Sequence, residues 1–171
     1  MDRIVSNATP LIYLAKTDNL TLLKAIANQV YIPEAVFQEV VIEGKRLGEK
    51  DAYRVEKCIN QGWLRVKEVK NLLSFDFPLH YGELEVISLA GQEGIKKVLI
   101  DDAKARSVAD LAGLKPVGTL WVILQAVKNR MMDFDEFLST LESIIHSGFY
   151  LKDEVYIKVI RKARQLSEEQ L

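Results

Sequence analysis

The sequence predicts an α/β domain in which helices cover both faces of a central parallel sheet of about five strands. Short apolar runs typical of strands alternate four or five times with segments that have helical spacing. The 171 residues fit one domain and can bury roughly two thirds of their unfolded surface. After Asp133 only helical segments follow, which we expect to extend the same domain.

The first part of the chain alternates strands and helices. Proline after an N-cap residue starts one helix at Thr9-Pro10, and Pro33 opens another that ends in the polar stretch 43–48. Apolar spacing predicts the remaining elements. The expected strands are 3–6, 30–32 and 63–69, and further helices cover 19–27 and 51–60.

The second part continues the alternation and then becomes helical. Residues 71–78 read as irregular, and Gly82 opens a largely buried helix that ends near Gly94. The following elements are a strand at 97–100, a helix at 103–112, a strand at 114–117, a helix from Gly118-Thr119 to 127, and helices at 134–145 and 153–165. We therefore expect an α/β part at 1–130 and a helical C-terminal extension at 131–171 of the same domain.

Composition narrows the classes of function. A net charge of −1 gives no broad positive field for non-specific nucleic-acid binding, so such a contact would need a local patch. Cys58 is the only cysteine and reads as a small apolar core residue, while His80 and His146 lack neighbours at zinc-ligand spacing. Without a long apolar run or a signal sequence, we expect no membrane segment and a cytoplasmic protein.

Acidic and amide side chains follow two strands that we expect to be neighbours. Ligands of open parallel sheets bind outside the carboxyl ends of the strands, where strand order reverses. Asn7 follows the first strand, and Asp101 and Asp102 follow the strand at 97–100. These side chains could therefore face one another.

Two helices add a carboxylate each. Glu83 shares a helix face with apolar positions three, four and seven residues on, and Glu39 lies on a partly inward side of its helix. Taken alone, each acid is most simply a helix cap or a solvated end. Together they would repel one another unless a cation neutralised them, and Mg²⁺ or Mn²⁺ favours such oxygen ligands.

Five segments, in the same order, resemble the motifs of PIN domains. They are SNATPLIYL at 6–14, PEAVFQE at 33–39, GELEVISLA at 82–90, VLIDD at 98–102 and GTL at 118–120. The segment GFYL at 148–151, with the helix after it, resembles the tail of an uncharacterised prokaryotic branch of that family.

The resemblance implies a PIN-like three-layer α/β/α domain and a divalent-metal ribonuclease, often the toxin of a VapC-like toxin–antitoxin pair. Carried over by position, the metal-binding residues would be Asn7, Glu39, Glu83 and Asp102, and the three acids would be catalytic. The family's first acid is usually aspartate. Asn7 at that position can still offer an amide oxygen to a metal but cannot act as a base.

Our leading hypothesis is phosphodiester hydrolysis by a water that one or two Mg²⁺ or Mn²⁺ ions activate. Asp101 is expected in the outer shell of this site, and Glu85 at the surface, on another side of its helix. Lys104 and Arg106 could hold the RNA backbone, although they are equally well explained as solvated helix charges.

Two readings from other classes remain open. The first is a binding module for nucleic acid or protein that keeps the scaffold and has lost turnover through Asn7. The second is a phosphate-accepting receiver domain, suggested by Asp101-Asp102 and Lys115-Pro116, but receivers place the acidic pair after the first strand. The resemblance also implies a homodimer and, for a toxin, an antitoxin partner. The basic residues Lys158, Arg161, Lys162 and Arg164 could touch RNA, but an exposed helix face is the commoner explanation for such a run.

Overall fold

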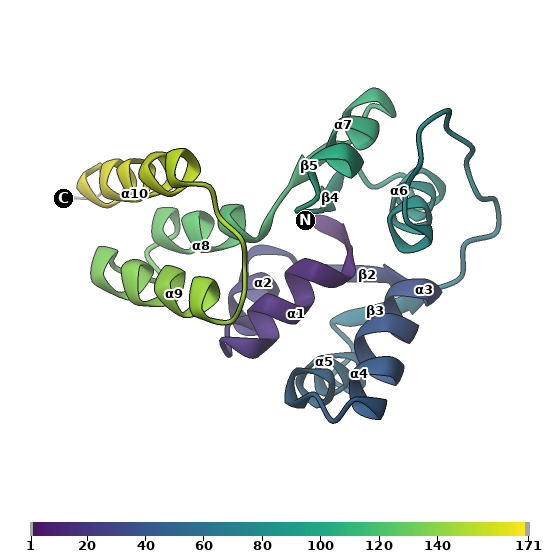
Figure 1. Ribbon diagram of the computed structural model, residues 1–171, viewed down its shortest axis with the longest axis horizontal. Coiled ribbons are helices and arrows are strands. Elements are labelled where there is room, and N and C mark those ends of the chain that lie inside the picture. Colours follow the sequence, from purple (N-terminus) through teal and green to yellow (C-terminus); the bar gives the residue numbers. More distant parts are fainter. Residues whose placement is uncertain (1, 170–171) are drawn as a thin grey trace.

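The computed structural model describes residues 2–169, and within them five parallel strands form a single sheet with the order β3-β2-β1-β4-β5 (Figure 1). The strands are β1 (Arg3–Ser6), β2 (Gln29–Pro33), β3 (Leu64–Lys67), β4 (Lys97–Leu99) and β5 (Lys115–Val117). The predicted α/β class and its sheet of about five strands are confirmed.

Strand order reverses between β1 and β4, as the sequence predicted. The two strands pair in parallel with Val5 opposite Val98 and Ser6 opposite Leu99. The backbone N–H of Asn7 then donates to the carbonyl oxygen of Leu99 at 2.9 Å. The first residues after both strands therefore lie at the same edge of the sheet.

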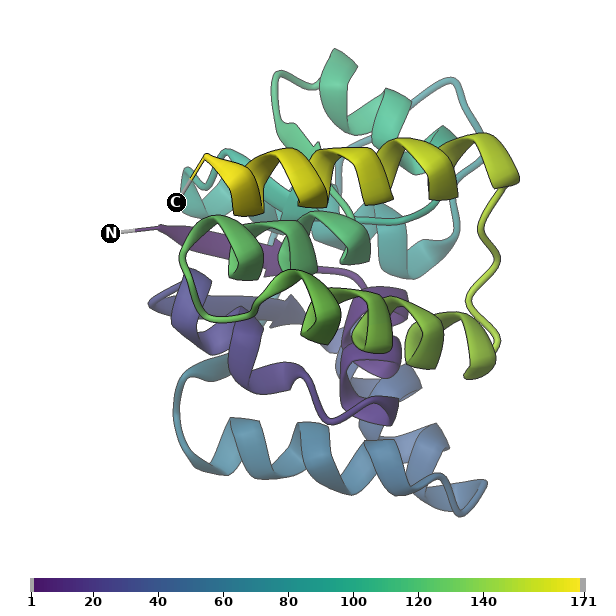
Figure 2. The ribbon, with the colours of Figure 1, turned by 90° about the vertical axis from the view of Figure 1, so that its left-hand side faces the viewer.

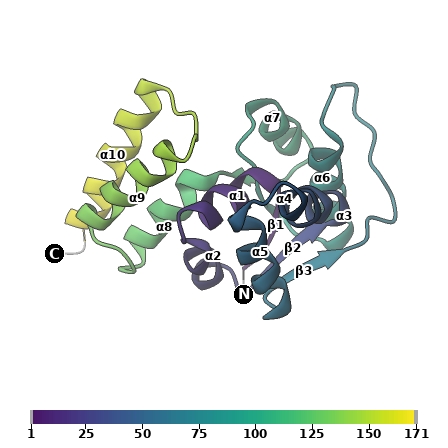
Figure 3. The same cartoon turned by 60° about the horizontal axis from the view of Figure 1, so that its bottom comes forward.

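Helices cover both faces of the sheet. In Figures 1 and 3, α1, α2 and α5 lie on one side, and α6 and α7 lie on the other. The helices are α1 (Ala8–Lys16), α2 (Leu20–Ile26), α3 (Glu34–Phe37), α4 (Gly44–Arg46), α5 (Lys50–Asn60), α6 (Tyr81–Glu93), α7 (Ala103–Leu111), α8 (Thr119–Lys128), α9 (Phe134–His146) and α10 (Asp153–Glu168). None of the helices in the described residues is both long and apolar enough to cross a membrane.

The helix that Pro33 opens is interrupted by a π-helical turn. Between α3 and α4 the chain forms η1 (Gln38–Glu43), in which the helix is wider than an α-helix. Glu39 lies in this turn and Val40 and Val41 are buried beneath it. Such π turns are rare and are frequent at functional sites.

The last three helices pack against one another at one side of the sheet. Figure 2 shows α8, α9 and α10 side by side. Their contact buries a second apolar cluster that includes Ile123, Phe137 and Ile144. Because α8 also contributes Val122 to the main core, one helix takes part in both clusters. The division of the chain at residue 130 stays a prediction.

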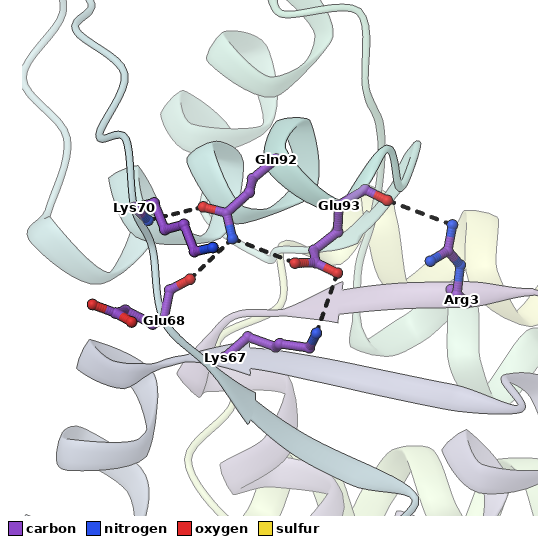
Figure 4. Close-up of polar contacts among 6 residues, drawn as sticks. All are labelled: Arg3, Lys67, Glu68, Lys70, Gln92 and Glu93. Atoms are coloured by element: carbon purple, nitrogen blue, oxygen red, sulfur yellow. Dashed lines mark hydrogen bonds and ion pairs between the residues drawn. The ribbon is translucent and has the colours of Figure 1, made fainter.

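Polar contacts tie the C-terminal end of α6 to the sheet (Figure 4). The carbonyl oxygen of Glu93 accepts a bond from Arg3 of β1 at 3.5 Å, and its carboxylate pairs with Lys67 of β3 at 3.5 Å. The side chain of Gln92 donates to the carbonyl oxygen of Glu68 at 3.0 Å and accepts from the N–H of Lys70 at 2.8 Å. These contacts hold α6, which carries Glu83, against two strands.

Candidate functional site

Four side chains predicted to form the site come from four different elements. Asn7 is the N-cap residue of α1, directly after β1, and Asp102 is the N-cap residue of α7, after β4. Glu83 lies in the first turn of α6 and Glu39 in the π turn. Asn7 and Glu83 are buried, whereas Glu39 and Asp102 are exposed.

Two of these side chains lie near Gly82, and the other two are linked to them through the charge of Glu83. A Cβ atom placed on Gly82 would lie 3.8 Å from Oδ1 of Asn7 and 3.8 Å from Oε2 of Glu39. Glu83, the next residue, feels the charges of both Glu39 and Asp102. We call Asn7, Glu39, Glu83 and Asp102 the acidic cluster.

The pKa of Glu83 is raised in this arrangement. Burial raises the pKa of its carboxyl group, and the negative charges of Asp102 and Glu39 raise it further. The backbone N–H of His80, which donates to Oε2 of Glu83 at 3.1 Å, and the nearby imidazole of His80 lower the pKa and offset part of the rise. A cation among these carboxylates would relieve the repulsion.

The chemistry of the acidic cluster suits a hard divalent cation. It offers three carboxylates and one amide oxygen, with no sulfur ligand. Within residues 2–169, however, no three His, Cys, Asp or Glu side chains are placed so that they could hold a metal ion directly. Mg²⁺ commonly binds one or two carboxylates and keeps several of its waters, so it does not need three direct ligands of this kind.

Asp101 has a structural role beside the cluster. Its Oδ1 accepts from the backbone N–H of Thr119 at 2.8 Å, and its Oδ2 accepts from the hydroxyl of Thr119 at 2.6 Å. A Cβ atom on Gly118 would lie only 2.6 Å from Oδ1 of Asp101, so this close approach requires glycine. Burial raises the pKa of the Asp101 carboxyl group, while Thr119 and the guanidinium of Arg106 lower it. Asp101 thus joins the turn before α7 to the turn before α8.

The prediction that Glu85 is a surface acid was wrong. Glu85 is only 7% exposed, and its Oε2 accepts from the backbone N–H of Ala35, in the first turn of α3, at 2.9 Å. A hydrogen bond with Glu85 and its charge raise the pKa of the Tyr81 hydroxyl group. Spacing correctly placed Glu85 on another side of α6 from Glu83, but α3 covers that side. Nothing local in the sequence indicates this contact.

The cations beside the cluster have separate surroundings. Nη1 of Arg106 donates to the carbonyl oxygen of Ile100 at 3.2 Å, so its guanidinium is partly committed to the protein. Lys104 is exposed and borders an apolar groove formed with Phe77 and Leu79. The basic residues of α10 are exposed, as expected, and Cys58 is buried.

The chain is similar to known proteins in structure and in sequence. A domain of a functionally unknown protein from Methanocaldococcus jannaschii is similar in structure, with 14% identity and a TM-score of 0.47 over 69% of this chain and 91% of that one. No curated protein matches the sequence.

The DUF3368 model, described as a PIN domain, matches residues 3–165. PIN domains have a nuclease-type fold, generally depend on divalent metals and are associated with nucleic acid. With its motifs, its sheet order and a family match over almost its whole length, this chain belongs to the PIN domain family.

Proposed function

We propose that the protein is a divalent-metal-dependent ribonuclease that hydrolyses phosphodiester bonds at the acidic cluster, with Glu39, Glu83 and Asp102 as its catalytic residues. The proposal is supported by the oxygens of Asn7 and Glu39, which lie near Gly82, and by the charges of Glu39 and Asp102, which act on the neighbouring Glu83. Acids so close together at the carboxyl edge of a parallel sheet are costly unless they bind a cation.

Each residue of the cluster has a defined part in the proposed mechanism. Glu39, Glu83 and Asp102 would hold Mg²⁺ or Mn²⁺ directly or through water, and Asn7 would add a neutral oxygen ligand. A bound ion of this kind supplies an activated water and stabilises the leaving oxygen. Asp102 also accepts a bond from the N–H of Ala105 at 2.9 Å, which holds its carboxylate at the start of α7. Since Asn7, Glu83 and Asp102 lie at helix N-termini, the local dipoles also favour a phosphate there.

A cleavage assay with purified full-length protein tests this function. We expect labelled RNA to be cleaved in Mg²⁺ or Mn²⁺ and to remain intact in EDTA. The matched variant is Asp102→Asn, because asparagine is also a good N-cap residue and preserves the start of α7. We expect at least a hundredfold loss of activity in this variant. Cleavage that survives both EDTA and Asp102→Asn would show that the cluster is not the catalytic centre.

A second candidate function is a PIN scaffold that binds nucleic acid or protein with impaired turnover. Asn7 supports it, because the amide removes one negative charge from the metal site. The variant Asn7→Asp distinguishes the two functions. Activity that appears only in Asn7→Asp would identify the natural chain as an impaired enzyme, whereas comparable activity in both chains would support the ribonuclease.

We also propose, on family resemblance, that the protein acts in the cytoplasm as the toxin of a toxin–antitoxin pair and forms a homodimer. Induced expression of the chain should then arrest growth, and Asp102→Asn should not. Sedimentation measures the oligomeric state. Normal growth during expression of an active nuclease would contradict the toxin role.

A further inference from the structure

A groove of about 900 Å³ is lined by residues on either side of Asp102 in the chain. These residues are Asp101 and Ala103, and Arg106 of α7 also lines the groove. The rest of the lining includes the segment 149–152, between α9 and α10, and Trp121 of α8. A segment from the helical extension therefore forms part of a surface that begins beside the proposed metal site.

The segment before the groove is held firmly on α1. The hydroxyl of Tyr13 donates to the carbonyl oxygen of Gly148 at 3.1 Å, and its ring meets that of Phe149 edge-on at 5.1 Å between centroids. Gly148 has a φ of 104°, a conformation that other residues rarely adopt. This anchoring presents the next residue, Tyr150, to solvent with 81% of its surface exposed.

The chemistry of the groove combines aromatic rings with cations. Tyr150, Trp121 and Phe149 supply the rings, and Arg106 and Lys152 supply positive charge. Two acids also line the groove: Asp110, and Asp101, whose carboxylate is bound to Thr119. Proteins that bind single-stranded nucleic acid use this combination, because unpaired bases stack on rings and cations contact the phosphates. The bases of a duplex are already stacked on one another and could not cover Tyr150 in this way. Within residues 2–169, the Tyr150 side chain forms no hydrogen bond, ion pair or ring contact that would explain its place in the groove.

We infer that this groove binds single-stranded polynucleotide beside the scissile phosphate, with an unpaired base stacked on Tyr150 and the backbone near Lys152. The inference rests on the proposed ribonuclease function, because it uses the acidic cluster as the point where the strand is cut. It assigns the GFYL segment at 148–151 a role in substrate binding.

Fluorescence anisotropy tests the inference in the full-length Asp102→Asn chain, which should not consume the probe. The probes are a 12-nucleotide RNA, the DNA of the same sequence, and the RNA annealed to its complement. We expect the single strands to bind more tightly than the duplex, and the RNA and DNA arms to show which sugar is preferred. Tyr150→Ala should weaken single-strand binding about fivefold to a hundredfold, the effect of losing one base stack.

Matched variants show whether stacking is responsible. Tyr150→Phe keeps the ring and should bind within about twofold of the parent chain. Tyr53→Ala removes another exposed tyrosine, from α5 outside the groove, and should leave binding unchanged. Lys152→Ala should make the slope of log affinity against log salt concentration shallower, by about the amount that one phosphate contact contributes.

The outcomes separate this inference from the proposed function. Tyr150-dependent binding without cleavage by the unmutated chain in Mn²⁺ would refute the nuclease and support the groove. Metal-dependent cleavage, with RNA binding that Tyr150→Ala leaves unchanged, would refute the groove and leave the nuclease intact. A preference for duplex, or no binding of any probe, would also overturn the inference.

Discussion

At the scale of single residues, a methyl group added at Gly82 should weaken metal binding without lowering the stability of the fold. The new Cβ atom of Gly82→Ala would make ordinary contacts, at 3.8 Å, with the side-chain oxygens of Asn7 and Glu39. Alanine is also the better helix former by up to about 1 kcal/mol. We therefore expect unchanged or raised thermal stability, but at least tenfold weaker Mn²⁺ binding by calorimetry, because the methyl group occupies space between ligand oxygens.

Gly91→Ala is the matched control for this prediction. Gly91 lies on the same helix, and a Cβ atom there would meet nothing within 4 Å. It should show the same gain in helix propensity with no loss of Mn²⁺ affinity. Equal Mn²⁺ affinity in the two variants would mean that the ion does not bind around Gly82.

The neighbouring residues Asp101 and Asp102 should respond differently to the same substitution. Asp101→Asn leaves one acceptor oxygen for the two bonds from Thr119, so we expect a loss of about 1–2 kcal/mol in the free energy of unfolding. Asp102→Asn keeps an N-cap and removes one of the charges near Glu83, so its stability should change by less than about 0.5 kcal/mol. Urea denaturation without metal measures both. An equal loss in both variants would contradict the separate roles.

At the scale of elements, Glu85 links the two helical segments that carry Glu83 and Glu39. Glu85→Ala leaves the partly buried N–H of Ala35 without its acceptor, which should cost about 1–2 kcal/mol. The start of α3 should also become less ordered, and the position of Glu39 with it. We expect weaker Mn²⁺ binding together with the lower stability, measured by calorimetry and urea denaturation.

Glu85→Gln retains an oxygen that can accept from Ala35, and it provides the control. Its loss of stability should be clearly smaller than that of Glu85→Ala, with Mn²⁺ affinity close to that of the unmutated protein. A glutamine variant as impaired as the alanine variant would show that the charge, and not the capping of α3, is what matters.

Most of the elements were predictable because their signals are local. Apolar spacing, Pro10, Pro33 and Gly118 identify the starts of helices, and their observed boundaries lie within a few residues of those expected. The π turn at 38–43 was not predictable, because a wider turn differs from an α-helix in hydrogen bonding and not in residue pattern. That Glu39 lies in a π turn therefore had to be seen in the structure.

At the scale of the whole molecule, we expect α8 to couple the sheet and the C-terminal helices into one unfolding unit. Phe137→Ala, in the second apolar cluster, should lower the free energy of unfolding by about 3–5 kcal/mol. Since Val122 and Ile123 of α8 lie in different clusters, the variant should still unfold in a single transition.

Differential scanning calorimetry measures this coupling. Leu111→Ala, which truncates a side chain that is 75% exposed, is the control and should change stability by less than about 0.5 kcal/mol. Two resolved transitions in Phe137→Ala would divide the chain into an α/β domain and a separate helical unit. That result would overturn the prediction that residues 131–171 extend the same domain.

The sequence by itself determined the order and kind of the elements, and it placed Asn7 and Asp102 at the ends of neighbouring strands. It could do so because periodicity and capping are local, and because a parallel sheet brings the carboxyl ends of its strands to one edge. Only the tertiary structure decided that Glu85 caps α3, that Asp101 binds Thr119, and that Tyr150 lines the same groove as Asp101. These contacts join segments far apart in the chain, and their distances depend on how whole elements pack, which residue spacing does not encode.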